Sequence, residues 1–318
     1  MISFIIIGRN EEKTIRSTIK SVLHAIEHCL INDFEILYVD SKSGDNTLQI
    51  VNEYSQIKTF VITGTCNAAI ARNIGARNSI GNILCFLDGD MELNADFLKV
   101  AIINNRLIHP FISGQLKNYY YCSYSLWNMI NTDYLHKNLK NDRYEVTTGG
   151  YFIIEKETWF SVNGMKTKFR RSQDLDIGLR LAKKGVKLLR KKELMVNHHT
   201  IHYENNDRRW KMLFDGGIFF TSVLIRDHLS NREYYRVLFR KNYSFLLLIL
   251  SLMLLLKTYW FICVYIFMLF IRILFKMDKI TLIEIYRKFS YFLVVDILCL
   301  VGLIFYYPKN IKIKYKQL

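Results

Sequence analysis

Two aspartates separated by one glycine, Asp88-Gly89-Asp90, stand directly after an apolar run of the sequence. A buried parallel strand that ends there would direct both carboxylates into the crevice beyond its carboxyl end. Mg²⁺ and Mn²⁺ favour one or two carboxylates together with phosphate oxygens and water. A cation held in this way can neutralise a diphosphate as it leaves. The same tripeptide also forms ordinary tight turns. The neighbouring residues are therefore needed to distinguish a metal site from a turn.

Polar residues gather after two other apolar runs as well. Residues 8–11 (Gly-Arg-Asn-Glu) follow the run 2–7, and residues 40–45 (Asp-Ser-Lys-Ser-Gly-Asp) follow the run 34–39. In open α/β sheets, ligands bind beyond the carboxyl ends of the strands. The three polar segments are therefore expected to meet at one site.

The elements that must position this site alternate along the first hundred residues. Short apolar runs indicate strands buried on both faces, and stripes of period 3.6 indicate helices. The expected strands cover residues 2–7, 34–39, 59–62, 82–87 and 148–154, and the expected helices cover 15–30, a segment opening near 45, 68–79, 173–184 and 208–229. Such alternation predicts an α/β fold with a mostly parallel, Rossmann-like sheet flanked by helices. Residues 118–146, rich in Tyr and Asn with weak periodicity, are interpreted as a lid or partner-recognition segment.

Composition narrows the class of protein. The chain has 318 residues, 51% of them apolar, and a net charge of +16. A globular core is possible, and a disordered or collagen-like chain is excluded. Residues 236–318 hold 13 basic and 3 acidic side chains, so most of the excess charge accompanies the most apolar part of the chain. This distribution favours a membrane partner and argues against nucleic acid.

The six cysteines show neither a CxxC pair nor metal-ligand spacing, which favours free thiols in a reducing compartment. The segment before Arg9 is too short and lacks the basic start of a signal peptide. The part before residue 236 is therefore expected on the cytoplasmic side of the cell membrane.

Two apolar segments near the C-terminus are long enough to span a bilayer. Residues 245–271 contain one charge, Lys257, and residues 289–307 contain one charge, Asp296. A span needs about 20 residues. The sequence therefore predicts a catalytic domain over 1–235 and a membrane-associated helical region over 236–318.

The arrangement of these segments is left open by the sequence. Lys257 and Asp296 would lie at similar depth in antiparallel spans, so we hypothesise that they pair. Two spans, however, would put the basic connector 272–288 outside, against the positive-inside tendency. A re-entrant or interfacial first segment, broken near Lys257, would keep that connector cytoplasmic.

Several segments, in order, resemble glycosyltransferase family 2, whose members have the GT-A fold. The matching pieces are SFIIIGRNEE, YVDSKSGDNT, AIARNIGARNSIGNILCFLDGD, and GGYFIIEKETWFSVNGM followed by SQDLDIGLRLAKKG. They cover about two-thirds of the chain. The resemblance implies an inverting transfer of a sugar from a nucleotide-diphosphate donor, most commonly a UDP-sugar, with a divalent metal.

The resemblance also implies roles for matching positions. Asp40 would contact the base, and Arg72 the nucleotide or its diphosphate. Asp88 would bind the ribose or the metal, and Asp90 the metal, with His198 or His202 as a further metal ligand. Asp174 would be the general base that deprotonates the acceptor hydroxyl. The residues expected to bind the nucleotide sugar are Arg9, Asn10, Glu11, Asp40, Ser43, Arg72 and Asp88.

The chain departs from the family pattern in a few places. Arg9 stands where a tyrosine is frequent, and Gln173 replaces the Glu that precedes the general base. Asp174 and Asp176 also have a plain structural interpretation, as acidic residues favoured in a first helical turn. Asn206 to Trp210 approaches the QxxRW element of processive polysaccharide synthases, but Asn replaces Gln.

The expected function is transfer of a sugar to a lipid-linked glycan, or another glycan acceptor, during cell-surface polysaccharide synthesis. A membrane-bound acceptor would explain the apolar tail. Two alternatives stay open at this point: a processive polysaccharide synthase, and a catalytically silent membrane-bound scaffold of the same fold.

Overall fold

The computed structural model describes residues 1–123, 128–136, 139–201, 215–254, 260–274 and 281–318. The chain forms two compact units. Unit 1 contains Met1–Asn205 together with Asn310–Leu318, and unit 2 contains Asn206–Lys309.

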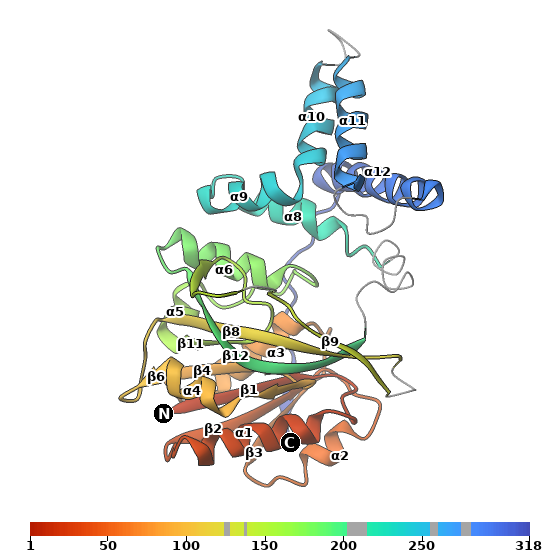
Figure 1. Ribbon diagram of the computed structural model, residues 1–318. Helices are drawn as coiled ribbons and strands as arrows, with labels where there is room; N and C mark the ends of the chain where they lie inside the picture. Colours follow the sequence, from red (N-terminus) through yellow and green to blue (C-terminus); the bar gives the residue numbers. More distant parts are fainter. Residues whose placement is uncertain (124–127, 137–138, 202–214, 255–259, 275–280) are drawn as a thin grey trace. The chain divides into compact units, whose positions relative to one another are not determined.

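Unit 1 is built on an eleven-stranded sheet (Figure 1). Its strands are β1 (Ile2–Gly8), β2 (Phe34–Asp40), β3 (Ile57–Ile62), β4 (Ile83–Asp88), β5 (Met91–Leu93), β8 (Phe111–Tyr121), β9 (Met129–Tyr134), β10 (Arg143–Glu145), β11 (Phe152–Glu155), β12 (Leu188–Ile201) and β13 (Tyr315–Gln317). The order is β10-β12-β8-β11-β4-β1-β2-β3-β13, with β5 beside β12 and β9 beside β8. Two short strands, β6 (Ile102–Ile103) and β7 (Arg106–Leu107), form a separate hairpin.

The register of the central parallel strands brings their carboxyl ends level. Gly8 at the end of β1 lies opposite Asp40 at the end of β2, and Ile7 lies opposite Asp88 at the end of β4. β3 continues the parallel set beyond β2. The predicted α/β fold with a large, mostly parallel sheet is confirmed in this half, while β11 joins β4 in the antiparallel sense.

Helices cover both faces of the sheet. Those of unit 1 are α1 (Ile15–His28), α2 (Thr47–Val51), α3 (Ala68–Asn78), α4 (Ala95–Ala101), α5 (Lys156–Ser161) and α6 (Gln173–Lys183). Residues of α1, α2 and α4 pack into one apolar core, and residues of α3, α5 and α6 pack into a second. Side chains of β1 alternate between the two cores, Phe4 entering one and Ile5 the other, which explains why the strand reads as continuously apolar. Leu30, expected on the buried stripe of the first helix, instead lies beyond its end and is 83% exposed.

The segment 118–146 has more regular structure than its pattern suggested. β8 runs on to Tyr121 and pairs antiparallel with β9, and β10 pairs with β12. His198 lies within β12, opposite Asn118. β9 and β10 are defined by their pairing with β8 and β12, which local periodicity does not report.

Unit 2 is helical. Its helices are α8 (Phe219–His228), α9 (Arg232–Lys241), α10 (Tyr243–Leu254), α11 (Trp260–Leu274) and α12 (Leu282–Phe305). By length and composition one described helix, α12, can cross a membrane, and α9 with α10 would make a second candidate if that pair, bent by 92°, counts as one span. For residues 245–271 the sequence left open a single span or a segment broken near Lys257, and the described residues form two shorter helices, α10 and α11.

The predicted boundary at residue 235 does not coincide with the division between the units. α8 belongs with α12, since Ser222 Oγ donates to the Cys299 carbonyl at 2.6 Å and the Phe219 and Tyr306 rings stack. Arg226 donates to the carbonyls of Gly302 and Leu303 at 2.7 Å each. The Leu303 carbonyl lies in the last turn of α12, where backbone carbonyls lack amide partners within the helix, whereas the Gly302 carbonyl also accepts from the Tyr306 amide at 3.1 Å.

Asp296 forms an ion pair with Arg272. Its Oδ1 lies 3.9 Å from Nη1 of Arg272 in α11, and its Oδ2 accepts a hydrogen bond from Tyr265 at 3.2 Å. Arg272 also donates to Ser244 Oγ at the start of α10. Lys257 lies outside the described residues, so the structure does not test its pairing.

Removing one partner of the buried Arg272–Asp296 pair should destabilise unit 2 more than removing both. Breaking a buried ion pair on one side costs about 3–5 kcal/mol, because the remaining charge is buried without compensation. We expect Arg272→Leu and Asp296→Leu each to lower the melting temperature in detergent, and the double variant to recover part of the loss. Strictly additive losses would show that the two groups do not interact.

Candidate functional site

The carboxyl ends of β1, β2 and β4 form a polar edge in unit 1. Several hydrogen bonds join the loop after β1 to the loop after β2 and the start of α2. Among them, the Asn10 amide donates to Ser43 Oγ at 3.0 Å, the Gly44 amide to Asn10 Oδ1 at 2.8 Å, and the Glu11 amide to Thr47 Oγ1 at 2.8 Å. The structure therefore brings together the first group of expected site residues, as the level strand ends required. Arg9 is exposed at this edge.

Asp40 is more deeply placed than a base-contacting residue was expected to be. Its side chain is completely buried. It accepts hydrogen bonds from the Ser43 amide at 2.8 Å and Ser43 Oγ at 2.5 Å, and from the Tyr38 hydroxyl at 3.3 Å. In this structure Asp40 shapes the turn through Lys42, whose φ is +64°.

Arg72 connects three parts of the site. Its Nη2 lies 2.5 Å from Asp88 Oδ1 and donates to the Gly150 carbonyl at 3.1 Å, while its Nη1 lies 3.9 Å from Asp174 Oδ1. The side chain is 2% exposed. Among the described residues, neither Nε nor Nη1 of Arg72 has a hydrogen-bond partner, nor does Oδ1 of Asp174. A buried cation with unused donors is suited to an anionic ligand.

Two glycines allow Arg72 to reach this position. α3 begins at Asn67, whose side chain accepts from the Ile70 amide at 2.8 Å, and a Cβ on Gly75 in the same helix would lie 2.2 Å from Ile5 Cγ2 of β1. Gly150 has a φ of +89°, and a Cβ there would lie 3.0 Å from both Arg72 Nη2 and Asp88 Oδ2. Close packing at both points leaves room only for hydrogen.

The two aspartates of the first turn of α6 have different surroundings. Asp176 is completely buried and pairs with Arg180 at 2.7 Å and with Lys166 at 3.6 Å. Asp174 retains 28% exposure and faces Arg72. The structural interpretation thus fits Asp176, and Asp174 is the carboxylate available for chemistry.

Carboxylates are crowded at this edge, and their pKa values shift accordingly. Burial, with the negative charge of Asp90 second, raises the pKa of Glu11 to about 9. Burial raises the pKa of Asp88 to about 6 in spite of Arg72. Burial also raises the pKa of Asp174, again opposed by Arg72. For Glu11 and Asp88, the negative charge of neighbouring carboxylates adds to the effect of burial, and a bound cation would relieve that part.

Asp90 lies beside His198. Its Oδ2 is 3.2 Å from His198 Nε2, and its Oδ1 is buried with no hydrogen-bond partner among the described residues. Asn118 Oδ1 lies 2.9 Å from the other ring nitrogen of His198, and Asn118 Nδ2 donates to Asp133 at 3.1 Å. This chain of contacts orients the imidazole toward Asp90.

The described protein groups do not by themselves complete a metal site. Within the described part of the chain no three His, Cys, Asp or Glu side chains are arranged to hold a metal ion. Asp88, expected as a possible ligand, is engaged by Arg72, and His202 lies outside the described residues. All six cysteines are free thiols.

Sequence reasoning missed the carbonyl of Gly150 and the side chain of Asn118. Gly150 lies in the quoted GGYFII segment, so the paired glycines were a usable signal. Asn118 had none, because only the pairing of β8 with β12 places it beside His198.

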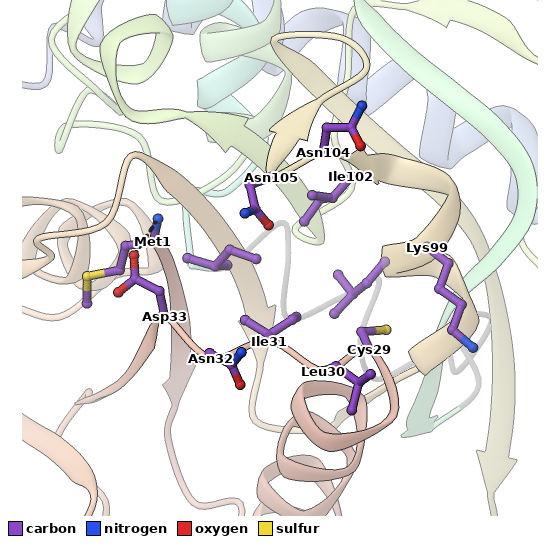
Figure 2. Close-up of a pocket in the computed structure, with 12 residues that line it drawn as sticks. Met1, Cys29, Leu30, Ile31, Asn32, Asp33, Lys99, Ile102, Asn104 and Asn105 are labelled. Atoms are coloured by element: carbon purple, nitrogen blue, oxygen red, sulfur yellow. Dashed lines mark ion pairs between the residues drawn. The ribbon is translucent and has the colours of Figure 1, made fainter.

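The cavity drawn in Figure 2 is remote from this edge. It has a volume of about 330 Å³ and is lined by Met1 and Asp33, at the amino ends of β1 and β2, and by residues such as Asn105, between β6 and β7. None of the residues expected to act on a ligand lines it.

Comparison with known proteins identifies relatives of this domain. The family model described as glycosyl transferase family 2 matches residues 3–201. A probable glycosyltransferase of Bacillus subtilis, YdaM, is 35% identical over 96 residues, covering 28% of this chain and 22% of that protein. An uncharacterized glycosyltransferase of Haemophilus influenzae is 26% identical over 197 residues, covering 57% and 62%. The chain thus spans less than two thirds of the length of either relative.

Solved structures share the fold. Residues 1–349 of S. aureus TarS, in complex with UDP-GlcNAc, superpose with a TM-score of 0.53 at 15% identity, covering 76% of this chain and 75% of that one. A second structure of TarS 1–349, for which no ligand is named, superposes with a TM-score of 0.50 at 18% identity, covering 70% of this chain and 65% of that one.

Glu11→Gln should stabilise the ligand-free protein increasingly as the pH rises. The folded-state pKa of Glu11, about 9, exceeds its ordinary value of 4.5. Folding therefore favours the protonated carboxyl group, and the contribution of Glu11 to the free energy of unfolding falls as the pH rises from 4.5 to 9. The amide does not titrate. We expect the gain in melting temperature over wild type to grow from pH 6 to pH 8.5, with an upper limit of about 1.4 kcal/mol per pH unit for one proton. A constant difference across this range would contradict the raised pKa.

Proposed function

The chain belongs to glycosyl transferase family 2, and we propose that it transfers a sugar from a UDP-sugar to an acceptor hydroxyl with inversion of the anomeric centre. The observation that carries this proposal is Arg72, a buried guanidinium with unused donors between Asp88 and Asp174. Asp88 would face the donor, and Asp174 would face the acceptor.

The donor would lie along the polar edge formed by the loops after β1 and β2. Arg72 supplies positive charge for the diphosphate, and Ser43, Asn10 and Arg9 border the same edge. The TarS structures described as complexes with UDP and with UDP-GlcNAc support a uridine nucleotide as the donor.

A divalent metal fits the residues present. Asp90 offers an unpartnered oxygen, and His198 is oriented toward it by Asn118, much as outer groups orient metal-bound histidines. Mg²⁺ and Mn²⁺ usually take only one or two carboxylates and complete their shell with phosphate and water. Asp90 and His198 would therefore hold the ion, which would supply charge neutralisation for the leaving diphosphate.

Asp174 would act as the general base. As the acceptor oxygen bonds to the anomeric carbon, the bond from that carbon to the diphosphate oxygen breaks, and the hydroxyl proton passes to Asp174. A raised pKa makes the carboxylate a stronger base than an ordinary Asp. Burial raises the pKa of Asp174, and the positive charge of Arg72, at 3.9 Å, opposes that rise.

Unit 2 would bring this site to a membrane-bound acceptor at the cytoplasmic face of the cell membrane. α12 has 24 residues, its most apolar 18-residue window has a mean hydropathy of 2.1, and only 17% of that window is buried, unlike a core helix of a soluble protein. A lipid-linked glycan in cell-surface polysaccharide synthesis is the acceptor that this attachment favours.

A thermal-shift panel tests the donor and the metal together. Full-length protein in detergent is heated with UDP, GDP, dTDP or CDP, each with and without Mn²⁺. We expect UDP with Mn²⁺ to stabilise most, by about 2.7 kcal/mol at 100 times its dissociation constant. Asp90→Asn should abolish the effect of the metal, and Asp96→Asn, at an exposed aspartate, should retain it. A response to no nucleotide by folded protein would favour the scaffold alternative.

Asp174→Asn should separate catalysis from donor binding. Loss of the base should lower the rate of UDP release from UDP-sugar by about 10²- to 10⁴-fold, with the thermal shift by UDP preserved. The wild-type rate should fall as the pH drops through the raised pKa of Asp174, above the ordinary value of 3.8. A variant with the wild-type rate would remove Asp174 from this role.

A further inference from the structure

Unit 2 is an insertion between two segments of unit 1. β12 ends at Ile201, and after Lys309 the chain returns to unit 1, where β13 pairs antiparallel with β3. The returning segment also exchanges hydrogen bonds with Thr167: its Oγ1 donates to the Ile311 carbonyl at 2.9 Å and lies 2.8 Å from the Ile311 amide. One folded sheet lies on one side of a bilayer. The chain between residues 206 and 309 must therefore cross a membrane an even number of times, or not at all.

α10 and α11 form an antiparallel hairpin that is short for a pair of spans. Ser244 at the start of α10 accepts from Arg272 near the end of α11, and Ser251 Oγ donates at 2.8 Å to the carbonyl of Phe261 near the start of α11. The described residues of these helices number 12 and 15, which corresponds to about 18 and 22 Å. The hydrocarbon core of a bilayer is about 30 Å thick.

The middle of α12 meets the base of this hairpin. Asp296 pairs with Arg272, and the Arg272 guanidinium lies 4.2 Å from the centre of the Phe292 ring. Figure 1 shows α12 running across the two helices rather than alongside them. The hairpin and α12 therefore cannot both stand perpendicular to one bilayer.

Either α12 or the hairpin of α10 and α11 can stand perpendicular to the bilayer. The number of crossings and the position of Asp296 favour the hairpin. If α12 crossed by itself, the number of crossings would be odd. Asp296, in the middle third of α12, would also lie near the bilayer centre, where charges are costly. If the hairpin enters instead, Arg272, Ser244 and Asp296 lie at its base, near the headgroups.

α9 has the surface of a helix that lies along a membrane. It is bent by 92° from α10, so it lies in the surface plane when α10 inserts. Arg232, Arg236 and Arg240 form one exposed stripe, next to exposed Tyr235 and Phe239. Basic residues beside exposed aromatic ones fit an anionic headgroup layer.

We infer that unit 2 is an anchor in one leaflet: α10 and α11 insert as a re-entrant hairpin, α9 and α12 lie along the membrane surface, and none of the described helices reaches the opposite side. This inference rests on the proposed membrane association. It places the start of α12 on the same side as the catalytic unit.

Quenching by brominated lipids tests the insertion of the hairpin. Trp260 begins α11, at the end far from Arg272. Full-length protein is reconstituted in phosphatidylglycerol–phosphatidylcholine vesicles brominated at acyl carbons 6 and 7 or at carbons 11 and 12. We expect the deeper bromines to quench more of the Trp260 fluorescence, measured as the difference between wild type and Trp260→Phe. Stronger quenching by the shallow bromines, or no difference between the proteins, overturns the inference.

Sidedness is measured independently with a membrane-impermeant maleimide on sealed vesicles of known orientation. Thr281→Cys reports the start of α12, and Lys20→Cys, exposed on α1, reports the catalytic unit. Both are made in a Cys122→Ser, Cys263→Ser background, which serves as the blank. We expect labelling from the same face. Labelling of position 281 from the opposite face, or only after detergent, overturns the inference.

Neither measurement depends on turnover. A protein that fails the nucleotide panel but passes both membrane tests would contradict the proposed activity and leave the anchor intact. The reverse result would contradict the anchor alone.

Discussion

The buried guanidinium of Arg72 is the interaction on which the site depends. It lies between carboxylates that come from β4 and α6, segments 86 residues apart in the chain. Without a cation there, Asp88 and Asp174 would face one another across a poorly hydrated space, and both pKa values are already raised by burial. One fixed positive charge thus lets two nearby acids remain available for different tasks.

That charge has strict steric requirements. Gly75 lets α3 approach β1 closely, and Gly150 leaves room beside the guanidinium and Asp88. Since burying an unpaired cation is costly, the helix, the loop and the strand end must fold together for the site to exist. Its unused donors remain for an anionic ligand.

Much of the site could be predicted from residue order because parallel strands end level. Apolar runs followed by Asn10, Asp40 and Asp88 were enough to locate the polar edge, and the register confirms that these ends align. The surroundings of each residue were harder to predict from the sequence. Asp40 proved to be buried in its own turn, and Asn118 reaches His198 only through the pairing of β8 with β12.

Local pattern was sufficient for the α/β class, the family resemblance and the apolar character of residues 245–307, because periodicity and short motifs depend on near neighbours. The folded chain decided the rest. The division of the units, the return of β13 to the sheet, and the pairing of Asp296 with Arg272 all join residues distant in sequence. The hydrophobicity of a segment indicates how readily that segment leaves water. The direction in which the segment enters a membrane depends on where the flanking segments are held.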